Sequence, residues 1–140
     1  MDKNTSYIKI REQGGRITKI RSEIVNIISN KDCLISSTGL LSGLSKLNIH
    51  PNRSTIYREL QFLTKNNVIL KKTISGVDYY EIPHDHHHHH HLVCMNCNSI
   101  IKVEMNNHLE EQEKQIAKQN KFNIINHSLE FYGYCQKCQA

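Results

Sequence analysis

Two pairs of cysteines with the same spacing constrain the fold of this chain more than any other feature of its sequence. The pairs read CMNC at residues 94–97 and CQKC at residues 135–138. A C-x-x-C turn lets two thiolates converge on one ion, and two such turns complete the tetrahedral sulfur shell that structural zinc prefers. Redox-active thiols or a disulfide pair are the alternative interpretation. The predicted zinc ligands are Cys94, Cys97, Cys135 and Cys138.

The segment between the two pairs must fold so that it brings them together. It contains 37 residues, more than an ordinary zinc finger places there, so a helix and strands are expected within it. Residues 108–122 show helical spacing, with acidic residues in the first turns where they favour the helix dipole. The apolar residues from Phe122 to Tyr132 predict a strand after this helix.

Basic residues gather in the first part of the chain. Residues 1–83 carry thirteen Lys and Arg against seven Asp and Glu, a net of +6, whereas residues 84–140 carry five against six, a net of −1. This asymmetry predicts an anionic partner for the first part, although a well-solvated basic face would look the same. No apolar run is long enough to span a bilayer, and the charged N-terminus shows no signal peptide. We therefore expect a cytoplasmic protein with no membrane partner.

The basic part has the pattern of a winged helix-turn-helix domain. Apolar residues recur at helical spacing in residues 17–29, 36–47 and 50–67, and β-type segments follow at 68–74 and 77–82 around an SG turn. Three helices and a hairpin are the order in which the third helix enters the DNA major groove. Any small helical core with a basic surface would show a similar pattern.

The third of these predicted helices offers a polar face. An apolar stripe of Ile56, Leu60 and Leu63 would be buried, which leaves its polar side chains free to face outward. Arginines there can contact bases or phosphates, and hydroxyl groups can contact either as well. The DNA-binding candidates on this helix are Arg53, Ser54, Thr55, Tyr57 and Arg58.

A histidine tract joins the basic part to the first cysteine pair, with seven histidines among residues 84–91. On an extended backbone, His89 and His91 would face one side, and His88 and His90 the other. One tract can therefore supply two separate metal sites. Imidazole suits zinc, iron, nickel or copper, and an added carboxylate shifts the preference toward Fe(II) or Mn(II). A disordered linker that binds metal without specificity is the alternative.

These motifs together resemble the ferric uptake regulator family of bacterial metalloregulators. The resemblance is carried by RITKIR, STIYREL, the histidines before LVCMNC, the segment NHSLEFYGYC and the final CQKC, and it extends from about Arg16 to Cys138. It implies an α+β protein, with an N-terminal winged helix-turn-helix domain at residues 1–83 and a C-terminal α/β dimerisation domain at residues 84–140. It also implies a metal-loaded homodimer that represses transcription from a palindromic, AT-rich operator. Whether dimers pair into tetramers is left open.

The resemblance assigns roles to individual residues. It supports the four cysteines as structural zinc ligands and Tyr57 with Arg58 as the recognition-helix pair. Arg21 matches a basic residue near the family's second helix, and Arg16 beside it is a further DNA-binding candidate. The implied regulatory metal ligands are Glu81, His89 and His91, with Cys33 and Glu104 as further candidates. The implied ligands of an additional metal site in the dimerisation domain are His88, His90, Glu110 and His127.

Departures from the family pattern bear on the metal. Cys33 stands beside the position where many members have a histidine ligand, and Glu104 lies two residues after the usual acidic ligand. His90 replaces an aspartate of iron sensors and resembles zinc sensors, whereas Glu81 stands where zinc sensors have a cysteine. We favour Fe(II) over Zn(II) as the regulatory ion, with Mn(II) as a surrogate. A zinc uptake regulator is the main alternative, followed by peroxide, manganese and nickel sensors.

Two other classes of function fit less well. An enzyme would need an open metal position beside a general base, and the chain contains neither H-E-x-x-H nor H-x-E followed by P-C-x-x-C. We therefore predict no enzymatic activity. A histidine-rich metal-storage protein would explain the tract but not the segment NRSTIYREL at residues 52–60.

Overall fold

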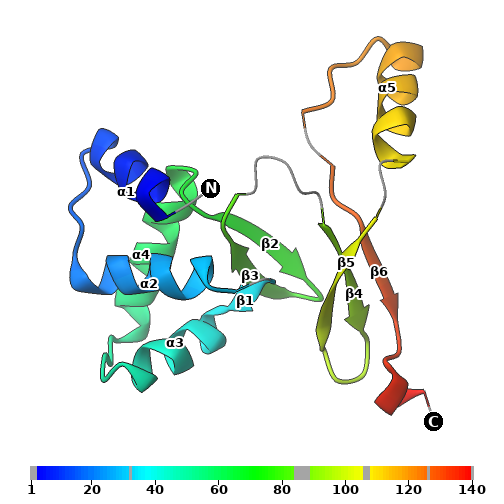
Figure 1. Cartoon of the computed structure of the whole chain (residues 1–140). Helices are drawn as coiled ribbons and strands as arrows, with labels where there is room; N and C mark the ends of the chain where they lie inside the picture. Colours follow the sequence, from blue (N-terminus) through cyan, green and yellow to red (C-terminus); the bar gives the residue numbers. More distant parts are fainter. Residues whose placement is uncertain (1–2, 32, 84–88, 106–107, 126, 140) are drawn as a thin grey trace. The chain divides into compact units, whose positions relative to one another are not determined.

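The computed structural model describes residues 3–31, 33–83, 89–105, 108–125 and 127–139 (Figure 1). The chain divides into two compact units, unit 1 at Met1–Asp85 and unit 2 at His86–Ala140. In the described part of the chain, every helix is too short or too polar to cross a membrane.

Unit 1 contains the predicted order of three helices and a hairpin. Its elements are α1 (Lys3–Glu12), α2 (Lys19–Ser29), β1 (Ile35–Ser36), α3 (Ser37–Lys46), α4 (Arg53–Lys65), β2 (Leu70–Ile74) and β3 (Val77–Glu81). The helices α2, α3 and α4 and the hairpin β2–β3 confirm the prediction of a winged helix-turn-helix. The helix α1 and the two-residue strand β1 were not predicted.

Polar side chains fix where the three predicted helices begin. Thr18, Ser36 and Asn52 each accept a hydrogen bond from the backbone N–H three residues further on, at 3.2, 3.1 and 2.8 Å. Such a cap satisfies one of the N–H groups that the first helical turn leaves unpaired, and its loss costs about 1 kcal/mol. The sequence therefore sets the entry of the chain into each helix of the DNA-binding fold.

One apolar core holds unit 1 together. The predicted stripe of α4 is buried, with Ile56, Leu60 and Leu63 at most 4% exposed. They join apolar side chains from α1, α2, α3 and β3, including Ile10, Ile24, Val25, Ile28, Leu40, Leu44 and Tyr80. Because one face of α4 is anchored in this core, its opposite face must point to solvent.

The hairpin of unit 1 is the wing. Its three-stranded sheet has the order β1-β3-β2, and all pairs are antiparallel. Ser75 and Gly76 connect β2 to β3 with positive φ angles of 51° and 77°, the combination that a tight two-residue hairpin turn requires.

Unit 2 contains β4 (His89–Cys94), β5 (Ile100–Glu104), α5 (His108–Asn120), β6 (Glu130–Gly133) and the 3₁₀ turn η1 (Gln136–Cys138). Its sheet has the order β5-β4-β6, with β5 antiparallel and β6 parallel to β4. A parallel pair needs a long crossover, and α5 lies within it, which explains the long gap between the cysteine pairs. The predicted helix is confirmed, but it ends at Asn120 and not at residue 122. The strand predicted after this helix is β6, and it is shorter than expected. It begins at Glu130, so residues 122–125 lie outside it.

Candidate metal centre and DNA-binding surface

The four paired cysteines form one cluster in unit 2. Cys94 ends β4, Cys97 lies in the turn before β5, and Cys135 and Cys138 flank and end η1. Their sulfur atoms all lie within 4.8 Å of one another, and the Sγ atoms of Cys97 and Cys135 are 3.8 Å apart. A tetrahedral site with Zn–S bonds of about 2.3 Å has sulfur atoms about 3.8 Å apart. The donor set and its spacing therefore fit a structural zinc ion.

The electrostatics of the cluster also suit a cation. Backbone N–H groups point at the sulfur of Cys94 and lower its pKa to about 6. The N–H group of Cys135 has the largest effect. The hydrogen bond from Asn96 lowers the pKa of Cys138, but the neighbouring thiol groups, Cys135 first, together with burial outweigh it and raise this pKa to about 11. The site thus favours the first thiolate and opposes the last. A divalent cation removes this conflict because it stabilises all four thiolates together.

The histidines of β4 alternate between the two faces of the strand, as predicted for an extended backbone. The rings of His89 and His91 meet edge to face, with centroids 5.0 Å apart. His90 instead stacks on His127, at a centroid distance of 5.6 Å. His90 and His91 are both buried, at 4% and 0% exposure. His88, the remaining tract histidine predicted as a ligand, lies outside the described residues.

The surroundings of His127 add a residue that sequence reasoning did not select. Its Nδ1 atom lies 2.8 Å from Oε1 of Glu113 on α5, and both side chains are partly buried. Glu110, the predicted ligand, is exposed one helical turn earlier. Residues three apart share a helix face. That spacing is the signal by which Glu113 could have been found.

The outer face of α4 is polar and accessible. Arg53, Ser54, Tyr57 and Arg58 are exposed, with Tyr57 at 62%, whereas Thr55 is half-buried. The hydroxyl of Ser54 donates to Oδ1 of Asn52, at 2.9 Å, so part of its capacity serves the helix cap. The arrangement exposes two arginines and a tyrosine to a polyanion, and the tyrosine hydroxyl accepts a hydrogen bond from Gln61 at 2.9 Å.

A comparison with known protein families identifies the family in which this cysteine cluster, these strand histidines and this helix occur together. The family model described as the ferric uptake regulator family matches residues 12–132, which is most of the chain. The chain belongs to the ferric uptake regulator family. It is therefore a metal-responsive transcriptional regulator, and its fold combines the winged helix-turn-helix with an α/β domain, as predicted.

Individual members of the ferric uptake regulator family resemble more than nine-tenths of the chain. The ferric uptake regulation protein of Helicobacter pylori strain 26695 is 26% identical over 137 residues, covering 94% of this chain and 87% of that protein. The crystal structure of the Vibrio cholerae ferric uptake regulator is 28% identical, with a TM-score of 0.80, and covers 96% of this chain and 100% of that one. The structure of the Francisella tularensis regulator with iron is 28% identical, with a TM-score of 0.75, and covers 91% and 96%.

The further regulatory-metal candidates of this family member lie in different surroundings. Glu81 is buried at the end of β3, where its Oε1 atom is 3.6 Å from the Nζ atom of Lys72. Glu104 faces His89 across the β4–β5 pair, but its side chain is 84% exposed and lies 3.6 Å from Lys102. Cys33 is half-buried ahead of β1. Of these three, Glu81 has the protected position that a metal ligand needs.

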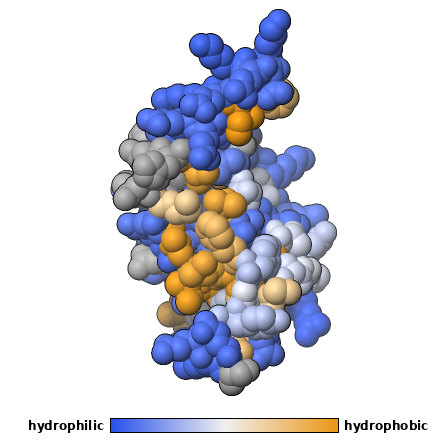
Figure 2. Space-filling view, turned by 90° about the vertical axis from the view of Figure 1, so that its right-hand side faces the viewer, coloured by the Kyte–Doolittle hydropathy of each residue, from blue (hydrophilic) through white to orange (hydrophobic). Residues whose placement is uncertain are grey.

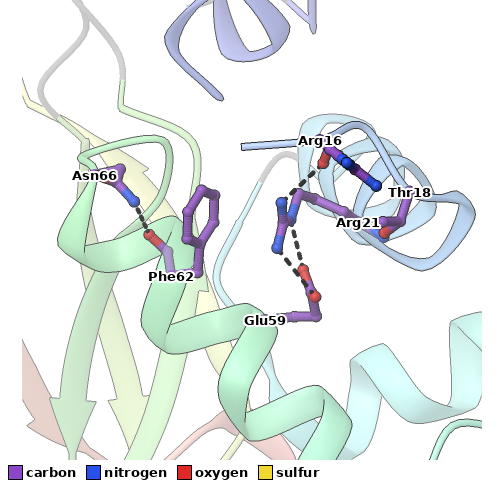
Figure 3. A network of polar contacts seen from close by, with 6 residues as sticks. All are labelled: Arg16, Thr18, Arg21, Glu59, Phe62 and Asn66. Carbon is purple, nitrogen blue, oxygen red and sulfur yellow. Dashed lines mark hydrogen bonds and ion pairs between the residues drawn. The ribbon is translucent and has the colours of Figure 1, made fainter. Parts of the chain in front are cut away.

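The two basic candidates near α2 differ in orientation. Arg16 is exposed, whereas the side chain of Arg21 is only 13% exposed. Figure 3 shows Arg21 pointing toward Glu59 on α4. The structure therefore leaves Arg16 on the surface and gives Arg21 to an internal ion pair.

Proposed function

We propose that this chain is an Fe(II)-dependent repressor that acts in the cytoplasm and binds a palindromic, AT-rich operator as a homodimer. Residues 1–83 would be its DNA-binding domain and residues 84–140 its dimerisation domain. One observation carries the proposal: a winged helix-turn-helix with an accessible basic recognition helix occurs in the same chain as buried imidazoles and a thiolate cluster. The iron-bound relative from Francisella tularensis supports the choice of metal.

We propose Glu81, His89 and His91 as regulatory ligands. A carboxylate with imidazoles, and without thiolate, suits Fe(II) or Mn(II) better than softer ions. Glu81 ends the last strand of unit 1, and both histidines belong to the first strand of unit 2. An ion held by all three would restrict how the two units move relative to each other, and so raise the fraction of DNA-competent dimers.

The exposed face of unit 2 supports the homodimer. Leu92, Ile101 and Phe131 lie side by side across β5, β4 and β6, at 42%, 52% and 41% exposure. Figure 2 shows apolar side chains gathered in a patch. An exposed apolar patch of this kind is typical of a protein interface. A second copy of the chain is the partner that the family resemblance implies.

Zinc sensing is the second candidate function. His90 stacks on His127, and both imidazoles stand in the additional metal site that the family resemblance implies. An imidazole at His90 in place of a carboxylate favours Zn(II) over Fe(II). This site would take its carboxylate from Glu110 or, as the contact with His127 favours, from Glu113.

Operator binding with different metals tests the proposal. A DNA duplex is first selected by the metal-loaded chain from a random library, and its binding is then titrated without oxygen. We expect Fe(II) and Mn(II) to tighten binding by at least about tenfold over chelated protein that keeps its structural zinc. Activation by buffered Zn(II) alone would establish the zinc sensor instead. Selection of no duplex with any metal would reject the proposed repressor.

Lys72 is expected to weaken metal binding at Glu81. Its ammonium group lies beside the proposed ligand and repels a cation that binds there. Replacement of Lys72 by Met should therefore tighten Mn(II) binding by about threefold, the scale of a partly exposed ion pair. The measurement is calorimetric titration of the zinc-loaded chain.

Lys71→Met is the matched control for Lys72→Met. Lys71 precedes Lys72 in β2 but pairs with Asp78, at 3.2 Å, instead of Glu81. It should leave the Mn(II) affinity unchanged. Equal tightening in both variants would mean a general charge effect and would remove the specific role of Lys72.

A further inference from the structure

Arg21 and Glu59 connect two helices of unit 1 through a two-pronged ion pair. Nε of Arg21 donates to one carboxylate oxygen of Glu59 at 2.7 Å, and Nη2 donates to the other at 3.2 Å (Figure 3). The two side chains are only 13% and 16% exposed. A bidentate guanidinium–carboxylate pair is directional and partly shielded from solvent here, so it fixes how α2 lies against α4.

The remaining nitrogen of Arg21 reaches a third segment. Nη1 donates to the backbone carbonyl of Arg16 at 2.8 Å. The guanidinium carbon also lies 4.0 Å from the centre of the Phe62 ring on α4, a cation–π contact. All three guanidinium nitrogen atoms of Arg21 thus make hydrogen bonds within unit 1. A direct phosphate contact would have to compete with these bonds.

Tight packing reinforces the position of this third segment. Gly15 lies so close to the Phe62 ring that a Cβ atom at residue 15 would be 2.6 Å from the ring carbon Cζ. The hydroxyl of Thr18, next in the segment, caps α2 at the backbone N–H of Arg21. Residues 15–18 are therefore held at both ends, by Phe62 of α4 and by the cap of α2, and Arg16 is the exposed basic residue between these two contacts.

We propose that Arg21 and Glu59 are positioning residues for DNA recognition, which hold Arg16 in a fixed place relative to Tyr57 and Arg58 on α4. The inference rests on the proposed DNA-binding function. Arg16 and the outer face of α4 come from distant parts of the sequence but must meet the same duplex together. The network supplies their common frame because it bonds the backbone at Arg16 to α4 through a single side chain.

Neutralising Glu59 separates this role from direct charge contact. Glu59→Gln keeps the size of the side chain but removes the carboxylate, so the surface near the DNA becomes more positive. If Arg21 contacted phosphate, this change would leave operator binding unchanged or tighten it. As a positioning pair, the variant should weaken binding of the selected duplex by about tenfold, within the range of coupled side chains.

The experiment uses the metal-loaded full chain and fluorescence anisotropy with the selected duplex. Glu23→Gln is the matched control, because it removes one carboxylate from α2 that contacts only a near neighbour in the same helix, Asn26, in the described structure. It should bind as tightly as the unchanged chain. Circular dichroism and the zinc content check that each variant is folded.

A double-mutant cycle gives a second readout. Arg21→Lys keeps the charge but cannot make the bidentate contact, and should also weaken binding by about tenfold. The double variant, Arg21→Lys with Glu59→Gln, should be no weaker than either single variant. Additive losses, or Glu59→Gln binding as well as the unchanged chain, would overturn the inference. Failure of the unchanged chain to bind any duplex would instead reject the proposed function.

Discussion

Replacement of Cys97 by serine is expected to remove zinc from the chain and to unfold unit 2 while unit 1 stays folded. The reason lies in how little apolar surface unit 2 buries. Among its described residues, the buried apolar side chains are Val93 and Cys94 alone, whereas the core of unit 1 has fourteen buried members. A structural zinc site contributes about 10 to 16 kcal/mol of apparent binding free energy. The fold of unit 2 must draw on that contribution.

The measurement combines zinc content with backbone hydrogen exchange. In Cys97→Ser, we expect less than about a tenth of an equivalent of zinc after mild chelation, and rapid exchange throughout β4, β5 and β6. The amides of α2 and α4 should stay protected. Cys97 is exposed, so the loss cannot be attributed to a disturbed core.

Cys33→Ser is the matched control for the zinc prediction. Cys33 is the one cysteine of the chain that belongs to neither C-x-x-C pair. It lies in unit 1, outside the sulfur cluster. Its replacement should leave zinc content and the protection of unit 2 unchanged. Retention of zinc and of protected strands in Cys97→Ser would show that zinc bound at the cluster does not stabilise the fold of unit 2.

The parts of the fold that follow from local patterns could be predicted from the sequence. The apolar stripe of α4 and the caps at Ser36 and Asn52 are written in short stretches of residues. By contrast, α1 has only a weak amphipathic pattern. It is held by tertiary contacts, namely burial of Ile10 and a 2.9 Å hydrogen bond between Tyr7 and Ser22. Such contacts between distant residues leave no local pattern to read.

The same distinction applies to the candidate sites. The spacing of the cysteines predicted that their four sulfur atoms would form one cluster. The period of two along β4 predicted that His90 would face the opposite side of the strand from His89 and His91. The partner of Arg21 could not be predicted, because Glu59 lies 38 residues away and no local pattern connects them. Glu113 lies 14 residues from His127, and its spacing from the predicted ligand Glu110 was the one local signal for it. A sequence shows which residues are charged, but it does not show which residue each of them pairs with. The sequence therefore predicted Arg21 as a DNA contact but did not indicate its ion pair with Glu59.

Replacement of His91 by glutamine is expected to abolish the metal response of operator binding. Glutamine is close in size and is also polar, but its amide is a poor ligand for a divalent transition metal. The loss of one ligand should weaken Fe(II) or Mn(II) binding by about a hundredfold, the upper end of the range for changing even an outer-shell partner of a ligand. By linkage, the selected duplex should then no longer tighten metal binding. Anaerobic anisotropy titrations with and without metal measure both effects.

His90→Gln is the matched control for His91→Gln, because it changes the same chemical group one residue away. His90 and His91 are both buried in β4, yet His90 packs on His127 and His91 on His89. If the regulatory ion uses the face of His89 and His91, His90→Gln should keep most of the metal response. Equal loss in both variants would mean that strand packing, not ligation, caused the defect. Retention of the metal response in His91→Gln would show that His91 is not a ligand of the regulatory ion, because loss of a ligand must weaken metal binding.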